Sequence, residues 1–292
     1  MTLLLLAGGM GSRYGGNKQF DSLGPYGELL LEFNLFDGIQ AGFQEVVVVT
    51  GQAKRDEIFD YLRAKLPTEI NLSCVVQRLS DVPFDYDATK RKKPWGTAHA
   101  VLSARKVINN PFVTLNADDH YGAQALKEAY DVCQKVKENT DSLGIITYRL
   151  GQTLSAHGAV SRGICGVRDG FLQDVIEYTQ LEMKKEHIID QETMKVFSSD
   201  TPTSMNLWVL QPLIFDEIEN QLKRLAPSLG STGELYLPDV VTSLLRQKSV
   251  MLRNRTTESH WHGMTYREDR QLVVESLKRL TEEGQYPSPL WT

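Results

Sequence analysis

The chain of 292 residues has few cysteines and no long hydrophobic run. Cys74, Cys133 and Cys165 are widely spaced and odd in number, which argues against a disulfide framework and is typical of reduced thiols in a cytosolic protein. The apolar run at residues 3–6 is too short to span a bilayer and follows no basic leader of the kind that a signal peptide carries. We therefore expect a cytoplasmic protein that has no membrane as a partner.

The chain also lacks an excess of positive charge, with 32 basic and 37 acidic residues and a formal net charge of −5. Nucleic-acid binding needs a basic face, so this balance argues against a nucleic acid as partner. An anionic ligand would instead be held by local cations or by a metal ion. Hydrophobic residues make up 41% of the chain, which is enough for the packed core of one large α/β domain or two small ones.

A glycine-rich loop follows the first apolar run. Leucines at residues 3–6 are typical of a buried parallel strand, and residues 8–16 contain five glycines. Backbone N–H groups of such a loop form a concave anion site, and Arg13 and Lys18 add cations suited to phosphate oxygens. No hydroxyl residue follows Lys18 as in a P-loop, and Tyr14 replaces the third glycine of a dinucleotide-binding loop. The sequence predicts a polyphosphate site of another kind just past the first strand.

Strands and helices alternate in the first half of the chain. β-branched and amphipathic patterns predict strands at 45–50, 70–77, 112–115 and 142–148, and helices at 29–41, 54–65, 96–107 and 123–138. This order is typical of an α/β fold with a Rossmann-like, mostly parallel central sheet and helices on both faces. Ligands of such sheets bind at the carboxyl ends of the strands, where Gln77 and the acidic segment 116–122 lie.

The segment Leu-Ala-Gly-Gly-x-Gly-x-Arg at residues 6–13, followed by Lys18, resembles the signature loop of the sugar-1-phosphate nucleotidyltransferases. The resemblance implies a GT-A-like nucleotidyltransferase fold, Mg²⁺ as cofactor, and a nucleoside triphosphate and a sugar 1-phosphate as substrates. The resemblance also allows a homo-oligomer but does not predict one. The resemblance predicts one domain over 1–292, with a nucleotide-binding half (1–150), a sugar-phosphate-binding half (151–265), and a C-terminal helix and tail (266–292).

The resemblance also implies roles for residues on the nucleotide side. Asp118 would bind Mg²⁺, because Ala117-Asp118 matches the family pattern and Mg²⁺ prefers one or two carboxylates plus phosphate oxygens. Asp119 is the alternative, which we expect to face away because adjacent strand residues alternate. Gln77 would hold the base together with the Gly-Thr step at 96–97. The predicted nucleotide-binding residues are Leu6, Ala7, Gly8, Gly9, Gly11, Ser12, Arg13, Gln77, Gly96 and Thr97, and the predicted catalytic residues are Arg13, Lys18 and Asp118.

Hairpins are expected in the second half, where Asp169-Gly170 is a strong signal for a turn. By the resemblance, a glycine on the first hairpin strand and a glutamate on the second contact the sugar, and an asparagine on a strand at 204–210 faces it. A further glutamate near 233–241 helps to hold the acceptor. The predicted substrate-binding residues are Asp118, Gly158, Glu177, Asn206 and Glu234.

Three parts of the family pattern are not matched. Relatives often have a lysine for the sugar phosphate directly after the glutamate, but Tyr178 stands there, which leaves Lys184 or Lys185 as alternatives. For a second metal ligand the chain offers His262, Thr265 or Asp269, and the sequence does not choose between them. The segments 79–93 and 181–196 look like insertions, and the basic end of the first is either a phosphate or partner contact or a solvated loop.

These residues predict a Mg²⁺-dependent transfer of a nucleotidyl group from a nucleoside triphosphate, with UTP or dTTP favoured, to a sugar 1-phosphate. Two other functions stay open. A cytidylyltransferase for a polyol or choline phosphate shares the short spacing from Arg13 to Lys18. A non-catalytic sensor of nucleotide sugars is the other, although such relatives tend to lose the loop cations or the metal-binding aspartate, all of which are present here.

Overall fold

The computed structural model of the protein describes residues 1–8 and 22–291. The glycine-rich loop beyond Gly8 therefore lies outside the described residues, and the roles predicted for Gly9, Gly11, Ser12, Arg13 and Lys18 remain predictions.

Strands and helices alternate up to the middle of the chain, as the patterns predict. The strands are β1 Thr2–Leu6, β2 Glu45–Thr50, β3 Asn71–Val76, β4 Phe112–Asn116, β5 Asp119–His120, β6 Ser142–Arg149, β7 Val160–Arg168, β8 Phe171–Lys184, β9 His187–Asp190, β10 Val196–Phe197, β11 Pro202–Leu210, β12 Met251–Thr256 and β13 His262–Gly263. The helices are α1 Leu30–Ala41, α2 Arg55–Arg63, α3 Thr97–Leu102, α4 Ala123–Val136, α5 Leu213–Leu229, α6 Leu237–Arg246 and α7 Asp269–Glu282.

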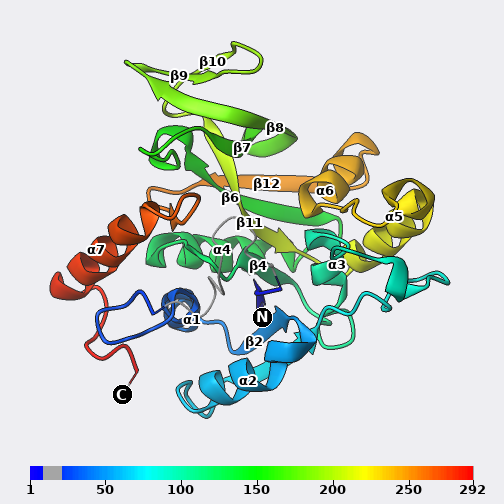
Figure 1. The fold of residues 1–292 in the computed structure, drawn as a ribbon, viewed down its shortest axis with the longest axis horizontal. Coiled ribbons are helices and arrows are strands. Elements are labelled where there is room, and N and C mark those ends of the chain that lie inside the picture. The colour runs from blue at the N-terminus through cyan, green and yellow to red at the C-terminus, as the bar shows by residue number, and fades with distance from the viewer. Residues whose placement is uncertain (9–21, 292) are drawn as a thin grey trace.

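A large mixed sheet runs through the molecule (Figure 1). Its order is β10-β9-β8-β12-β6-β11-β4-β1-β2-β3, and β7 pairs with both β11 and β8. The four strands β3, β2, β1 and β4 are parallel, as predicted, but β11 runs antiparallel between β4 and β6. The expectation of a mostly parallel sheet thus holds for these four strands, and β6 and β12 form a further parallel pair. The other described pairs of this sheet are antiparallel, because the chain returns through its centre in the opposite direction.

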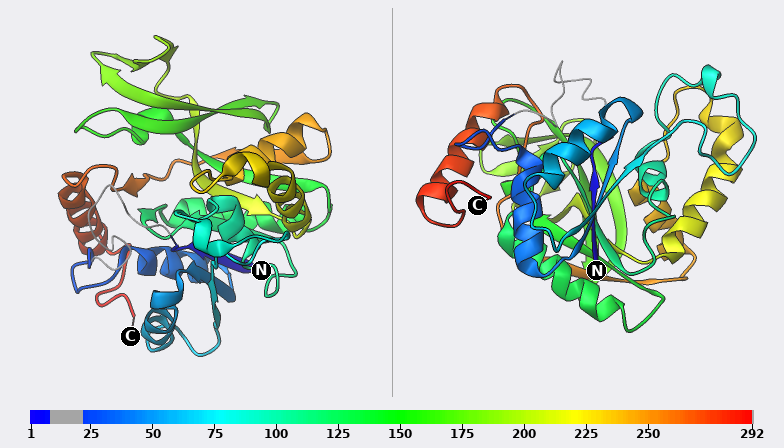
Figure 2. Two further views of the ribbon diagram at one scale, coloured as in Figure 1. Left: turned by 45° about the vertical axis from the view of Figure 1, so that its right-hand side comes forward. Right: turned by 90° about the horizontal axis from the view of Figure 1, so that it is seen from below.

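Helices cover both faces of the sheet, and the alternation of side chains along β1 explains how. Leu3 and Leu5 pack into one buried cluster with residues of α1, α2 and α4, whereas Leu4 packs into a second cluster with residues of α3, α5 and α6. Seen from below in Figure 2, α1 and α4 lie on one side of the sheet and α3 and α5 on the other. A run of leucines that is buried on both faces is what a central parallel strand requires.

The hairpin predicted at Asp169-Gly170 is present. It joins β7 to β8, and both turn residues have positive φ, 52° and 78°, as a two-residue hairpin turn of this type needs. The distal part of β8 continues with β9 and β10 into an arm that rises from the body of the molecule (Figure 1). The proposed insertion at 181–196 forms this arm.

The C-terminal helix α7 and the tail pack against α1. Val273, Leu277, Tyr286 and Leu290 form a small buried cluster with residues of the first helix, including Phe33. The end of the chain is therefore anchored on the first helix, α1. Among the described helices, none has the length and apolar character needed to cross a membrane. The three cysteines are buried and unpaired, as expected.

Candidate active site

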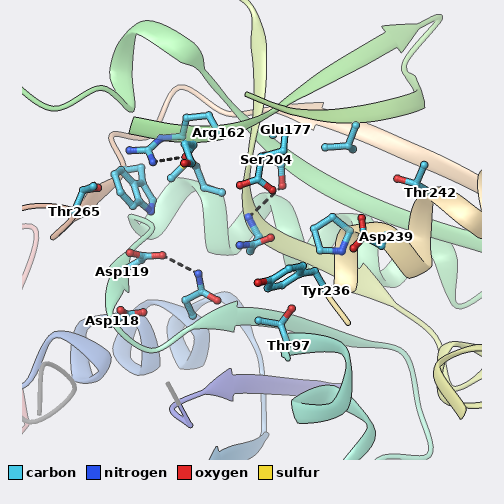
Figure 3. A pocket seen from close by; sticks show the side chains of 18 of the residues that line it. Thr97, Asp118, Asp119, Arg162, Glu177, Ser204, Tyr236, Asp239, Thr242 and Thr265 are labelled. Carbon is cyan, nitrogen blue, oxygen red and sulfur yellow. Dashed lines mark hydrogen bonds between the residues drawn. The ribbon is translucent and has the colours of Figure 1, made fainter. Parts of the chain in front are cut away.

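A cavity of about 780 Å³ opens at the carboxyl end of β4 (Figure 3). Its walls come from the end of β4, from the first half of β11, from the β7–β8 hairpin, from the start of α6, and from the segment around β13. Four carboxylates line it, those of Asp118, Asp119, Glu177 and Asp239, against one cation among the described lining residues, Arg162. Such an acidic cavity needs further positive charge before it can hold a polyphosphate.

Both aspartates of the acidic segment line this cavity. The expectation that Asp119 faces away was wrong, because β4 ends at Asn116 and the next two residues form a turn, so strand alternation does not apply. Asp119 is buried, and one carboxylate oxygen accepts a hydrogen bond of 3.0 Å from Asn116 Nδ2. Asp118 is half-buried. The backbone is fixed by Asn34, whose side chain donates to the carbonyl of Asp119 (2.6 Å) and accepts from the N–H of Tyr121 (3.1 Å).

The carboxylates of Asp118 and Asp119 are suitable as the protein ligands of a magnesium ion. Gly263 in β13 pairs with Asp119, and a Cβ there would lie 2.6 Å from the Asp119 carboxylate, so glycine keeps the space beside this oxygen open. No cluster of three or more His, Cys, Asp or Glu suited to a metal exists within residues 1–8 and 22–291. Mg²⁺ does not require one, since it completes its octahedral shell with water and phosphate oxygens.

The three candidates for a second metal ligand differ in position. Thr265 lines the cavity. His262 does not line it: its ring stacks on His120, and burial lowers its pKa to about 4. Asp269 is held by Ser155 and by the backbone N–H of Tyr266 (2.7 Å). Of the three, only the hydroxyl of Thr265 is placed to face a ligand.

The residues predicted to hold the base lie together at the end of β3. Gln77 Nε2 donates to the carbonyl of Gly96 (3.1 Å), and a Cβ on Gly8 would lie 3.0 Å from Gln77 Oε1. Gly96 has φ of 98°, and a Cβ there would lie 2.4 Å from the carbonyl oxygen of Leu235, so only glycine fits. Thr97 lines the cavity, and its hydroxyl also accepts from the backbone N–H at the start of α6 (3.0 Å).

Sequence reasoning missed the histidine that orients this glutamine. His99 is fully buried, and burial lowers its pKa, which keeps the ring neutral. Its Nε2 contacts the carbonyl of Asp81 at 2.7 Å and so carries the proton, which leaves Nδ1 to accept from Gln77 Nε2 (3.2 Å). The proximity of His99 to the Gly-Thr step was the one signal in the sequence.

The wall of the cavity that β7 and β8 form contains Glu177 as predicted, but it does not contain Gly158. Glu177 on β8 lines the cavity, and its direct partner on β7 is Gly163, which lines it too. Gly158 does not line it, because β7 begins only at Val160 and Gly158 instead packs against the hydroxyl of Tyr266. The sequence shows glycines at both positions, and only the register of the hairpin distinguishes them.

Of the two remaining predicted substrate-binding residues, Asn206 lines the cavity and Glu234 does not. Asn206 lines the cavity, with φ of 62°, at the point where the pairing of β11 with β6 shifts its register. A non-glycine residue in the left-handed region is strained, and such strain concentrates at functional positions. Glu234 does not line the cavity; it accepts a hydrogen bond of 2.6 Å from the hydroxyl of Tyr236, which does. This bond raises the pKa of Tyr236 to about 12.

Neither the expected phosphate lysines nor the basic loop reaches the cavity. Tyr178 packs on Phe197 and accepts a hydrogen bond from Lys195, and Lys184 and Lys185 lie at the tip of the β8–β9 hairpin, outside the lining residues.

The insertion at 79–93 is packed against the body of the protein. Arg91 at its basic end is buried, donates to the carbonyls of Gly230 and Gly233, and stacks on Trp95 with its guanidinium carbon 3.7 Å from the ring centre. This arginine holds the loop in place and is not available to a phosphate.

Comparison with known proteins agrees with this arrangement. Residues 3–178 match the family model described as nucleotidyl transferase. The chain is 24% identical over 239 residues to a UTP–glucose-1-phosphate uridylyltransferase of Streptococcus pyogenes, covering 76% of this chain and 70% of the relative.

Two solved structures share the fold. One is a putative glucose-1-phosphate thymidylyltransferase from Bacillus anthracis, with a TM-score of 0.67, 14% identity, and coverage of 95% of this chain and 96% of that one. The other is a UDP-glucose pyrophosphorylase complexed with UDP-glucose, with a TM-score of 0.62, 18% identity, and coverage of 94% and 97%. The resemblance to sugar-1-phosphate nucleotidyltransferases is thereby confirmed. The chain belongs to the nucleotidyl transferase family and is an enzyme of this kind.

Proposed function

We propose that the protein transfers a uridylyl or thymidylyl group from UTP or dTTP to a sugar 1-phosphate, with Mg²⁺, and releases pyrophosphate. One observation carries the proposal: a single cavity joins the strand-end aspartates to Glu177 and Asn206 on the acceptor side, and Gln77, at the end of β3, hydrogen-bonds to Gly96 directly before the cavity residue Thr97. The related uridylyltransferase acts, by its name, on UTP and glucose 1-phosphate, so this pair is the first to test.

The orientation of Gln77 supports uracil or thymine as the base. Its Nε2 must donate to the carbonyl of Gly96, so its Oε1 is the atom that faces Gly8. No donor to this oxygen occurs in the described part of the chain. The ring nitrogen N3 of uracil and thymine carries a hydrogen and can donate to Oε1, whereas N3 of cytosine is an acceptor. This contact favours UTP and dTTP over CTP.

The cavity supports a mechanism of positioning and charge neutralisation. When bound at Asp118 and Asp119, Mg²⁺ would neutralise charge on the phosphates. In the same proposal Arg13 holds the β- and γ-phosphates that leave, and Lys18 holds the α-phosphate that is attacked. Glu177 and Asn206, which line the same cavity, accept hydrogen bonds from sugar hydroxyls and orient the acceptor. A phosphate monoester is largely ionised at neutral pH, so its oxygen attacks without a general base.

The proposal extends to the organisation of the chain. We assign residues 1–150, with their parallel strands, to a Rossmann-like nucleotide-binding half of a GT-A-like domain. Residues 151–265 form the acceptor half in this assignment, with Gly163 in the place first given to Gly158 and Tyr236 as the cavity residue supported by Glu234. The C-terminal helix and tail, 266–292, brace the first helix. We propose the cytoplasm, where nucleoside triphosphates are available, as the location.

Pyrophosphate release tests the proposal. The purified chain is incubated with each common nucleoside triphosphate in turn against a set of sugar 1-phosphates, once with Mg²⁺ and once with a chelator. We expect release that depends on UTP or dTTP, on one sugar phosphate and on the metal. Release with CTP and a choline or polyol phosphate would replace the proposal by a cytidylyltransferase. Tight binding of a nucleotide sugar without any release would replace it by a sensor.

A further inference from the structure

The acceptor side of the cavity lacks the lysine that relatives place after the glutamate, so the phosphate of the acceptor needs another partner. Tyr178, which holds that position, packs away from the cavity on Phe197. Among the described residues that line the cavity, the only cation is Arg162. The two loop cations predicted for the nucleotide are already assigned to its triphosphate.

Arg162 is buried, and the nearby charges of Asp119 and Asp269 partly offset the effect of burial on its pKa. It is 8% exposed and forms no ion pair with any described residue. Its Nε and Nη2 donate to the carbonyl of Thr153, and its Nη1 donates to the carbonyl of Ser161 (2.8 Å). A guanidinium has five N–H groups, so one on each terminal nitrogen is left for a ligand. Burial lowers the pKa of Arg162 to about 10, which leaves the group charged at neutral pH.

Trp261 offers a second donor beside this arginine. Its ring centre lies 5.0 Å from the guanidinium carbon of Arg162, and it lines the same cavity. The indole is 9% exposed, and its Nε1–H is buried with no acceptor among the described residues. A buried donor that is left unpaired destabilises the protein, so a site that retains one is expected to use it for a ligand.

These donors lie at the end of the cavity where the reaction takes place. A Cβ on Gly263 would lie 2.2 Å from the Trp261 ring and 2.6 Å from Asp119 Oδ1, so the indole and the aspartate are neighbours. In Figure 3, Arg162 and Asp119 are drawn toward one end of the cavity, and Asp239 and Thr242 toward the other. A bound sugar phosphate can therefore direct its phosphate to the donors and its hydroxyls to the carboxylates.

We propose that Arg162 and Trp261 bind the phosphate of the acceptor, and so take the role that a lysine after Glu177 has in relatives. This inference rests on the proposed function. The guanidinium and the indole N–H supply charge-assisted and neutral hydrogen bonds to two different phosphate oxygens. The carbonyls of Thr153 and Ser161 hold the guanidinium in one orientation, so little side-chain entropy is lost when the phosphate binds.

Two variants test the proposal with matched controls. Arg162→Lys keeps a charge but loses the planar fork, and Trp261→Phe removes the N–H while keeping an aromatic ring. Arg168→Lys, on the same strand but outside the cavity, and Trp291→Phe, at an indole that donates to Glu32, serve as controls. KM for glucose 1-phosphate and for UTP, kcat, and the thermal midpoint are measured for each protein.

We expect KM for the sugar phosphate to rise roughly 10- to 100-fold in both variants, while KM for UTP changes less than threefold. The controls should match the wild type in both constants. Unchanged KM for the sugar phosphate in both variants would overturn the proposal. A parallel loss of affinity for both substrates with a lowered thermal midpoint would also overturn it, because a purely structural role predicts that pattern.

Direct binding separates this inference from the proposed function. Inorganic phosphate is titrated into the wild type and into Trp261→Phe by calorimetry, a measurement that needs no turnover. Weaker binding in the variant, even if no substrate pair reacts, supports the phosphate site while the proposed function fails. If the wild type turns over substrate but both proteins bind phosphate equally well, the proposed function stands and the inference about Arg162 and Trp261 fails.

Discussion

Replacing Gly96 by alanine should damage both stability and nucleotide binding. The residue has φ of 98° and ψ of −178°, a region open almost only to glycine, and occupying it costs about 1–3 kcal/mol for other residues. A Cβ would also lie 2.4 Å from the carbonyl oxygen of Leu235, so that backbone has to move. The move weakens two hydrogen bonds, from Ala98 N–H to Leu235 O (3.1 Å) and from Leu235 N–H to Trp95 O (2.8 Å).

The total follows from these parts. Two hydrogen bonds at about 1 kcal/mol each, added to the backbone strain, give a loss of about 3–5 kcal/mol in the free energy of unfolding. Gly27→Ala is the matched control, because its φ is 87° but a Cβ there meets nothing within 4 Å, so it isolates the strain at about 1 kcal/mol. Gly51→Ala, with neither positive φ nor contact, should cost less than about 0.5 kcal/mol.

Urea unfolding followed by tryptophan fluorescence gives the three free energies, and calorimetric titration with UTP gives the loss of affinity. We expect the order Gly96 above Gly27 above Gly51, with weakened nucleotide binding only in the Gly96 variant. A Gly96→Ala protein within about 0.5 kcal/mol of Gly27→Ala would refute the steric argument.

Three further predictions concern other parts of the molecule. Burial raises the pKa of Asp37 from 3.8 to about 7, so the stability that its protonated form provides is present below pH 3.8 and lost as the pH rises through 7. Between pH 3.8 and 7 the free energy of unfolding of the wild type should fall by on the order of 4 kcal/mol relative to that of Asp37→Asn, as measured by urea unfolding at several pH values. A difference between the two proteins that does not change with pH would contradict the raised pKa. Gln77→Ala should weaken UTP binding and reduce the preference for UTP over CTP by roughly tenfold, in competition assays; an unchanged preference would exclude Gln77 from base recognition. Asp118→Ala should lower kcat by ~100-fold or more in the pyrophosphate-release assay, with circular dichroism used to verify that the variant is folded. Near-normal turnover would exclude Asp118 from the metal site.

Local signals predicted the fold better than the site. The Asp169-Gly170 turn and the strand at 45–50 follow from neighbouring residues and are present as predicted. The central antiparallel strand β11 was not foreseen as such, because its direction is set by pairing with β4 and β6, both more than 50 residues earlier in the chain.

Errors at the site have the same origin. The prediction of Gly158 is wrong because the glycine opposite Glu177 is Gly163, and this strand register is set by contacts across the hairpin that the sequence alone does not give. Arg162 and Trp261 are distant in sequence and carry no motif, so only their contact in three dimensions reveals a shared site.

The central claim, attack of a sugar phosphate on the α-phosphorus of a nucleoside triphosphate, is tested most directly with UTP labelled in its α-phosphate. The protein is incubated with labelled UTP, glucose 1-phosphate and Mg²⁺, and the products are separated by chromatography. The account predicts that the label appears in UDP-glucose and that unlabelled pyrophosphate forms in equal amount. Label found only in UMP or UDP, with no nucleotide sugar when glucose 1-phosphate or any other common sugar 1-phosphate is supplied, would contradict it.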